Sequence, residues 1–251
     1  MRKIQPKSIA VSFTNIVLKN VALLSFVEVA ANNRLDFFNA DGEFDEEDVK
    51  TLAAEQCMLF VAVGWENFLT ELFICYINRD CSVYQQYLQN RVNQAIVEKL
   101  GHELSQEVKF VPTGHLTKSQ IKTSLDPANY NLTFKDAADL KDKAARFLAA
   151  DHAKIFKSLT EQECAVLNAW LAIRNYLGHR SAGSWEKMKI SLSSHHLDKR
   201  MRWTAYAKRD LGKYLMVTVT NDGEHVPRMI VFLHGLISLC TALTPNIKKS
   251  P

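Results

Sequence analysis

The longest uninterrupted pattern in the chain opens with four consecutive acids, Asp45-Glu46-Glu47-Asp48, and continues to about Asn78. Apolar residues recur along it at spacings of three and four, as they do on one face of a helix, and no proline interrupts them. Acids in a first turn are favoured by the helix dipole. We therefore predict one helix of more than thirty residues, a length that is typical of a helical bundle.

The same periodicity predicts helices along most of the remaining chain. One follows an N-cap at Ser8 and runs to about Leu35. The others are expected at Ser82–Leu100, Lys135–Ala149, His152–Leu159, Thr160–Ser181 and Arg228–Leu243, the last with Pro227 at its first turn.

Two stretches depart from the helical pattern. Residues 102–133 contain prolines and many small polar residues, and we interpret them as an irregular connection with a short helix at Lys118–Ser124. Tyr214–Thr220 is rich in β-branched residues and is followed by the turn sequence Asn221-Asp222-Gly223. This predicts a small β-hairpin, with Trp203–Ala207 as the partner strand.

The predicted fold class is mainly α, a helical bundle with long antiparallel helices and a small β-hairpin near the C-terminus. We expect a single domain over residues 1–251, with a helical core at 8–181, a hairpin insertion within 200–227 and a final helix at 228–243. An apolar content of 47% supports a hydrophobic core rather than disorder. A net charge of +4 permits an anionic partner without requiring one.

Location and cofactors are inferred from the N-terminus and the cysteines. The apolar run of the first twenty residues is broken by polar ones, which is too polar for a signal peptide or a membrane span, so we expect no membrane association and a cytoplasmic location. The cysteine count of five is odd, and no Cys/His spacing suited to a metal occurs. We therefore expect buried thiols in a reducing compartment, with no metal and no cofactor.

The candidate site lies in the stretch Thr160–Ser181, which opens with a capping box and ends in Arg-Asn-Tyr-Leu-Gly-His. This motif places Arg174, Asn175 and His179 at the C-terminal end of the helix. Arg174 borders the apolar face, where a charged residue needs a partner or a ligand. We expect Gly178 to end the helix, so that His179 folds back beside the last turn. Even in a continuing helix, Asn175 and His179 would be neighbours.

The Arg-to-His spacing alone is weak evidence. With 11 arginines and 8 histidines, a histidine at one given spacing after an arginine arises by chance about one time in three. Arg146 with His152 and Arg228 with His234 satisfy a slightly looser rule. The motif is distinguished by Asn175, by Gly178 and by the capped amphipathic helix that leads into it.

Here the chain resembles a known family. The sequence IRNYLGH resembles the signature of HEPN domains, in which an arginine and a polar residue precede a histidine at short spacing. The stretch VGWENFLTELF resembles the WExFL stretch in the second-helix region of HEPN proteins of the RiboL-PSP type. Together the two stretches span about a quarter of the chain.

The resemblance implies a metal-independent endoribonuclease that acts as a homodimer, with the Arg/His pairs of two subunits in one cleft. His179 would transfer the proton of the ribose 2′-OH, Arg174 would stabilise charge on the phosphoryl oxygens, and Asn175 would orient the phosphate or His179. Glu66 would face the cleft and hold Arg174 or His179; the alternative for Glu66 is a solvated helix residue. Ser181 stands where HEPN toxins that are regulated by nucleotide transfer carry a tyrosine.

Basic and aromatic residues after the motif suggest contacts with RNA. The predicted RNA-binding residues are Arg180, Arg200, Arg202, Trp203, Lys208 and Arg209. The alternative is an ordinary solvated surface on a partly exposed hairpin.

The predicted function is therefore RNA cleavage, and the resemblance suggests a toxin or an anti-phage defence effector with an antitoxin or defence-system protein as partner. Two other functions stay open. One is a non-catalytic HEPN-like module that binds RNA or nucleotide, or scaffolds a partner protein. The other is a plain helical interaction protein in which the motif is accidental.

Overall fold

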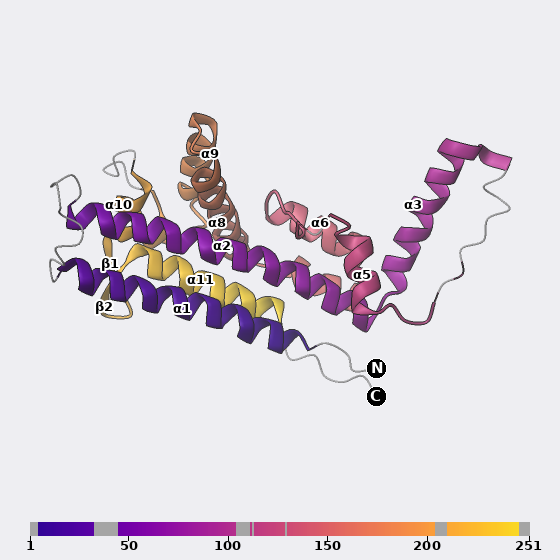
Figure 1. Ribbon diagram of the computed structural model, residues 1–251, viewed down its shortest axis with the longest axis horizontal. Coiled ribbons are helices and arrows are strands. Elements are labelled where there is room, and N and C mark those ends of the chain that lie inside the picture. The colour runs from indigo at the N-terminus through magenta and orange to yellow at the C-terminus, as the bar shows by residue number, and fades with distance from the viewer. Residues whose placement is uncertain are drawn as a thin grey trace. The chain divides into compact units, whose positions relative to one another are not determined.

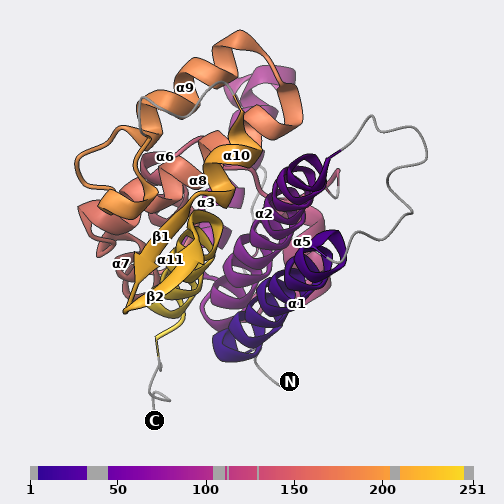
Figure 2. The ribbon, with the colours of Figure 1, turned by 90° about the vertical axis from the view of Figure 1, so that its left-hand side faces the viewer.

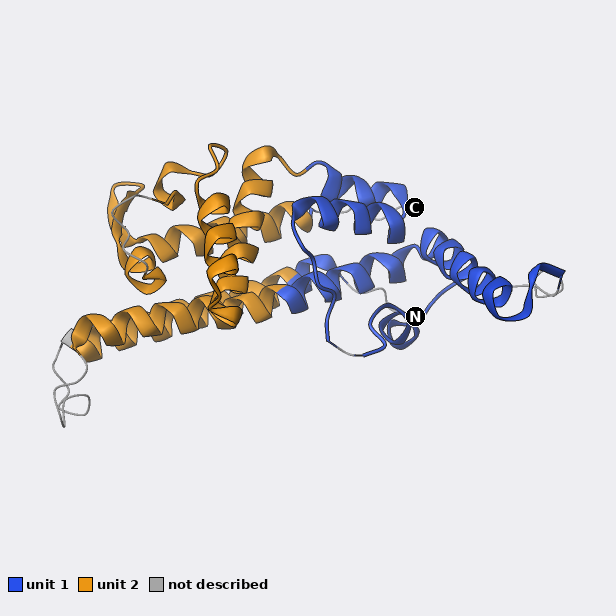
Figure 3. Cartoon of the chain, turned by 90° about the horizontal axis from the view of Figure 1, so that it is seen from above, with its two compact units in different colours: residues 1–9, 66–158, 245–251 blue, residues 10–65, 159–244 orange. Residues whose placement is uncertain are grey.

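The computed structural model describes residues 5–32, 45–103, 111, 113–128, 130–203 and 210–245. This part of the chain is mainly helical, with one two-stranded antiparallel sheet near its C-terminal end (Figure 1), which confirms the predicted fold class. The chain divides into two compact units (Figure 3). Unit 1 comprises residues 1–9, 66–158 and 245–251, and unit 2 comprises residues 10–65 and 159–244.

The elements follow one another in this order: α1 (Pro6–Asn32), α2 (Glu46–Arg79), α3 (Ser82–Leu100), α5 (Lys118–Leu125), α6 (Ala137–Phe147), α7 (Ala150–Lys157), α8 (Glu161–His179), α9 (Ala182–Leu192), the 3-10 helix η2 (Lys199–Met201), α10 (Leu211–Met216), β1 (Thr218–Asn221), β2 (Glu224–Pro227) and α11 (Arg228–Leu243).

Helix α2 is the long helix that the sequence predicts, with 34 residues and three acids in its first turn. One face of its middle is buried, where Trp65, Phe68 and Leu69 are each at most 2% exposed. The apolar residues of the WENFL stretch are therefore core residues. The border between the two units falls within this helix, after Trp65.

Unit 1 has an aromatic core. The ring of Phe73 lies 5.5 Å from Phe134 and 5.1 Å from Phe156, measured between centroids. The ring of Tyr76 stacks on His152 at 4.7 Å. His152, one of the competing histidines in the sequence, thus packs against a core residue of this unit.

In unit 2, α1 and the first half of α2 lie side by side (Figures 1 and 2). Phe13 packs edge-on against Trp65 at 5.3 Å. A Cβ atom on Gly64 would lie 3.1 Å from Cγ2 of Ile16, so the glycine permits the close approach of α1. Helix α11 packs on α8, where a Cβ atom on Gly235 would lie 3.1 Å from Val166.

The predicted start of the first helix, after an N-cap at Ser8, is three residues too late. Ser8 lies within α1, and its hydroxyl donates to the carbonyl oxygen of Gln5 at 2.7 Å. Pro6 is the first helical residue, a position at which its missing N–H costs nothing.

A helix over 182–192 was not predicted from the polar and basic sequence there. Its N-cap is Ser181, whose hydroxyl accepts from the N–H of Ser184.

The predicted hairpin is present, but its strands differ. The partner of β1 is β2, with Val219 opposite Val226, rather than the segment starting at Trp203, of which residues 204–207 lie outside the described part. The residues before Thr218 form α10, because Asp210 caps that helix and Leu211, Tyr214 and Leu215 are buried. Glu224–Pro227 has only one β-branched residue, so the second strand carried little signal.

All five cysteines are free thiols, as predicted, and Cys57, Cys75, Cys81 and Cys240 are buried. The prediction of burial is wrong for Cys164, which is only partly buried. Burial raises the pKa of Cys57 to about 11 and the pKa of Cys75 and of Cys240 to about 12. Such thiols are protonated and unreactive at neutral pH.

Within the described residues, two helices are long and apolar enough to cross a membrane by length and composition, over Pro6–Ala31 and Glu46–Arg79. In the apolar window of the second, 67% of the residues are buried, which is typical of a core helix. In the first, only 17% are buried.

We predict that Gly212→Ala lowers the free energy of unfolding by about 1–3 kcal/mol, because overpacking a closed contact forces the backbone to shift. A Cβ atom on Gly212 would lie 2.6 Å from Cβ and 2.8 Å from the carbonyl oxygen of Thr51. Gly183→Ala is the matched control, because nothing lies within 4 Å of its Cβ position. Urea unfolding of both variants measures the difference, and equal stability would contradict the close packing of α10 on α2.

Candidate functional site

Helix α8 carries the candidate site and begins as the sequence predicts. The hydroxyl of Thr160 accepts from the N–H of Glu163, and the carboxylate of Glu163 accepts from the N–H of Thr160 at 2.8 Å. The predicted apolar face is buried and consists of Val166, Leu167, Trp170, Leu171, Ile173 and Leu177. The start and the inner face of the helix are therefore fixed by local sequence.

The helix ends at the last residue of the motif, His179, as the sequence predicts, but the expected turn at Gly178 is wrong. The helix continues through Gly178 to His179, and Arg180 is the residue that leaves it, in a left-handed conformation with φ of 48°. Its backbone N–H donates to the carbonyl oxygen of Tyr176 at 2.7 Å. A left-handed cap is usually glycine or asparagine, so an arginine there requires compensating contacts.

Those contacts come from Glu55 of α2 and from Tyr176. Both terminal nitrogens of Arg180 bind the carboxylate of Glu55, one of them at 3.2 Å to Oε1. The guanidinium also lies over the ring of Tyr176, 5.4 Å from its centroid. The hydrogen bonds to Glu55 raise the pKa of Arg180. This side chain therefore anchors the end of α8 to α2.

The three residues of the motif lie at this anchored end. Nη1 of Arg174 donates to Oδ1 of Asn175 at 3.1 Å, and both side chains are partly buried. His179 is exposed. Because the helix is regular, Asn175 and His179 lie one turn apart on the same face, whereas Arg174 and His179 differ by about 140° around the axis.

Glu66, the fourth predicted catalytic residue, lies on α2 and is partly buried. It belongs to unit 1, whereas Arg174 and His179 belong to unit 2. Its backbone carbonyl accepts the hydroxyl of Thr70 at 2.9 Å. Its role in the site stays a prediction.

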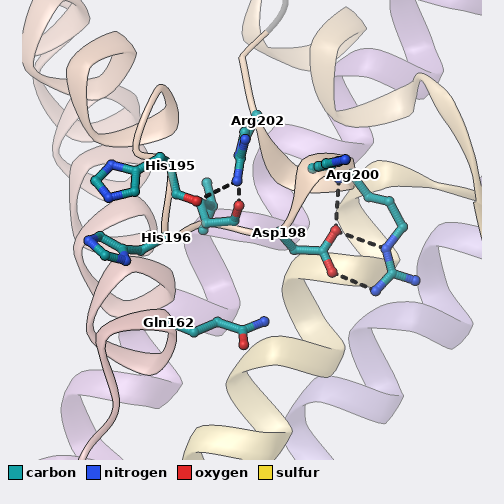
Figure 4. A pocket seen from close by; sticks show the side chains of 8 residues that line it. Gln162, His195, His196, Asp198, Arg200 and Arg202 are labelled. Atoms are coloured by element: carbon teal, nitrogen blue, oxygen red, sulfur yellow. Dashed lines mark hydrogen bonds and ion pairs between the residues drawn. The ribbon is translucent and has the colours of Figure 1, made fainter.

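A basic pocket lies at the opposite end of α8 (Figure 4). Its cavity volume is about 530 Å³, and it is lined by Gln162, His195, His196, Leu197, Asp198, Lys199, Arg200 and Arg202. Gln162 is in the first turn of α8, seventeen residues before His179, so about 25 Å of helix separates the pocket from the motif. The predicted RNA-binding residues therefore form two groups rather than one.

Polar contacts within the chain orient the side chains of this pocket. Arg200 forks onto Asp198, with Nη2 at 2.7 Å from Oδ2 and Nε at 3.0 Å from Oδ1. Nε of Arg202 donates to the carbonyl oxygen of Leu197 at 2.7 Å. Nδ1 of His196 lies 3.1 Å from a carboxylate oxygen of Glu161. The hydrogen bond from Arg200 holds the pKa of Asp198 below its ordinary value.

Trp203 is part of an aromatic row rather than an open stacking surface. Its ring lies 5.2 Å from Trp185 and 4.8 Å from Tyr214, and Trp185 in turn lies 4.9 Å from Tyr176. This row extends from the end of α8 through α9 to α10. The other two predicted RNA-binding residues, Lys208 and Arg209, lie outside the described residues.

In the competing pair Arg228 and His234, the arginine is buried and bonded within the chain. Arg228 is 5% exposed and donates to the carbonyl oxygens of Arg200 at 2.7 Å and of Tyr214 at 3.0 Å. Its guanidinium lies 4.3 Å from the centroid of the Tyr214 ring, and burial lowers its pKa. His234 is exposed on α11.

Two contacts of the site were missed in the sequence. Glu55 pairs with Arg180 across 125 residues, and its only signal was an acid within the apolar pattern of α2. Asp198 pairs with Arg200, and its only signal was an acid within a basic run.

Comparisons of this chain with protein-family models, with curated proteins and with solved structures gave no match. In the part of the chain that the structure describes, no group of three or more His, Cys, Asp or Glu side chains has a geometry suited to a metal ion.

We predict that a double-mutant cycle with Glu55→Gln and Arg180→Ala gives a coupling free energy of about 0.5–1 kcal/mol, because Arg180 is half exposed and water weakens the pair. The coupling should fall in high salt. The pair Glu186–Lys189, on the surface of α9, is the control and should couple more weakly. Urea unfolding of the single and double variants measures both values, and a coupling of zero for Glu55 and Arg180 would contradict the anchor.

We predict that Asp198→Asn destabilises the protein by about 1 kcal/mol at pH 7 and by progressively less below about pH 4. The pKa of Asp198 is lowered in the folded state, so its contribution is fully present above the unfolded pKa and disappears as pH falls through the folded one. Urea unfolding between pH 3 and pH 7 tests this, with exposed Glu224→Gln as control. A loss of stability that does not vary with pH would contradict the ion pair with Arg200.

Proposed function

We propose that this protein is an endoribonuclease of the HEPN type, which cleaves RNA by attack of a ribose 2′-OH on the adjacent phosphate and acts as a homodimer. One observation carries the proposal. At the anchored end of α8, exposed His179 lies one turn after Asn175, and the amide oxygen of Asn175 accepts a hydrogen bond from Arg174.

The chemistry assigns one task to each side chain. His179 takes the proton from the 2′-OH, whose oxygen then bonds to phosphorus while the bond to the 5′-oxygen breaks. Arg174 stabilises the negative charge on the phosphoryl oxygens, and Asn175 fixes the guanidinium that it binds. The products are a 2′,3′-cyclic phosphate and a 5′-hydroxyl end. This balance needs no metal, since the 2′-OH is the nucleophile.

A second copy supplies the missing acid. The leaving 5′-oxygen needs a proton, and one α8 end provides a single histidine. Two copies related by two-fold symmetry would place a second His179 across the scissile bond. Within one copy, Arg174 and His179 lie about 140° apart around a regular helix and do not face each other. A dimer would bring Arg174 of one copy toward His179 of the other.

The second candidate function is binding of RNA or nucleotide without cleavage, and the basic pocket favours it. Its histidines, Lys199 and the two arginines present donors suited to phosphate oxygens. Scaffolding of a partner protein belongs to the same class. A role as toxin or anti-phage effector, with a partner that restrains it, follows from the resemblance and is part of the proposal. So is a cytoplasmic location, which is inferred from the polar N-terminus and the cysteines.

We predict that His179→Ala lowers the rate of RNA cleavage at least about 100-fold, because it removes the general base. Arg174→Ala should have an effect of similar size. The assay uses end-labelled RNA with excess chelator, and the products are analysed for cyclic phosphate. The matched control is His234→Ala, which removes another exposed histidine, on α11, and should leave the rate unchanged.

The outcomes separate the two functions. Replacing the nucleotide before the cleaved bond by its 2′-deoxy form should block cleavage there. Cleavage that survives His179→Ala would exclude the assigned mechanism. RNA binding without any cleavage, weakened by Lys199→Ala, would favour the binding module.

A further inference from the structure

The outer side of α1 is apolar and exposed. Val11, Leu18, Phe26 and Val29 are 52%, 55%, 69% and 58% exposed. Their spacings of seven, eight and three residues place them on one stripe of the helix. The opposite side of α1 is buried and includes Phe13, Val17 and Leu24. Helix α1 therefore has a core side and a second apolar side with no cover in the described chain.

Helix α2 has a matching stripe. Leu52, Phe60 and Val63 are 57%, 61% and 56% exposed, and Gln56 lies between them on the same face. The remaining surface of this part of α2 is largely buried. Both stripes belong to unit 2, as residues 10–65 form one compact body with residues 159–244.

The two stripes lie on the same side of the helix pair. Ile16 of α1 contacts the position of Gly64 on α2. Leu23, 56% exposed, lies two turns beyond Ile16 on the same side of α1, and Phe60 lies one turn before Gly64. Leu23 and Phe60 thus flank the seam between the helices. We refer to the whole surface as the α1–α2 face, made of Val11, Leu18, Leu23, Phe26, Val29, Leu52, Phe60 and Val63.

This face carries almost no charge. Among the exposed residues of 11–29 and 52–63, Lys19 is the only charged one. Eight large apolar side chains at more than half exposure present several hundred square ångströms, compared with about 300–600 Å² for the largest patch on a typical monomer. A stable dimer buries about 800 Å² on each partner. The α1–α2 face is of that order.

A second copy of the chain fits this face better than a lipid surface does. A two-fold contact places a patch against itself, and a patch that is apolar apart from Lys19 and a few polar side chains is largely complementary to itself. Asn15 and Gln56 lie within the stripes and are exposed. A protein interface offers hydrogen-bond partners to such side chains, as buried asparagines do between paired helices, whereas hydrocarbon offers none.

We infer that the α1–α2 face binds the same face of a second copy, so that two helix pairs form a two-fold four-helix contact. The inference rests on apolar exposure and does not depend on the proposed ribonuclease activity. It also bears on the candidate site. Leu52 lies one turn before Glu55, and Glu55 holds Arg180 at the end of α8. The end of α8 in each copy therefore lies beside the contact.

The test is the mass of the protein in solution, measured by sedimentation equilibrium at micromolar concentration. The wild-type chain should have twice its mass of 28.5 kDa. The double variant Phe26→Glu/Phe60→Glu should be monomeric, with a dissociation constant at least about 100-fold weaker, because each copy brings two unpaired carboxylates into an apolar contact. Both residues are more than 60% exposed, so circular dichroism should show unchanged helicity.

The matched control is Ile190→Glu, which introduces a charge at an equally exposed apolar position on α9 and should leave the dimer intact. A monomeric wild type, or a double variant that remains dimeric, would overturn the inference. So would a monomeric wild type that co-sediments with phosphatidylcholine vesicles, since the face would then bind lipid instead.

Discussion

The ion pair between Glu55 and Arg180 holds the C-terminal end of α8, which carries the candidate site, against α2. It joins α2 to the end of α8 across 125 residues, and it holds an arginine in a left-handed cap that a glycine would normally occupy. Glu55 is 11% exposed on its side chain, so its carboxylate is largely withdrawn from water and needs this partner. With the helix end fixed in this way, His179 is exposed while Asn175 and Arg174 are bonded to each other beside it.

Features that depend on contacts between neighbouring residues could be predicted from the sequence, whereas features that depend on contacts between distant residues could not. The length of α2, the capping box at Thr160 and the bounds of α3 at Ser82 and Leu100 depend on neighbouring residues, and all three are present in the structure. That the helix continues through Gly178 and turns only after His179 could not be predicted, because Gly178 is a local stop signal whereas the contact that holds the helix end comes from Glu55 on another helix. The partner of the first strand was missed for a related reason, since Glu224–Pro227 has little strand propensity of its own and pairs because the turn at Asp222 and Gly223 returns the chain.

The candidate site is built on side chains that also have structural contacts. Arg180, Arg200 and Trp203 look like RNA ligands in the sequence, yet each is engaged with the chain itself, through Glu55, Asp198 and the aromatic row. About 25 Å of α8 lies between the motif and the basic pocket, a separation that a bound single strand would have to span to use both. A dimer on the α1–α2 face would place the α8 end of each copy beside the contact.

The chemical ends of the RNA fragments distinguish attack by the 2′-OH from other routes of cleavage. Purified protein is incubated with a defined single-stranded RNA in excess chelator, and the new 3′ ends are identified by mass spectrometry. The proposed mechanism predicts that the new ends are 2′,3′-cyclic phosphates and that their formation requires His179. Intact RNA, or new ends that carry a free 3′-hydroxyl, would contradict it.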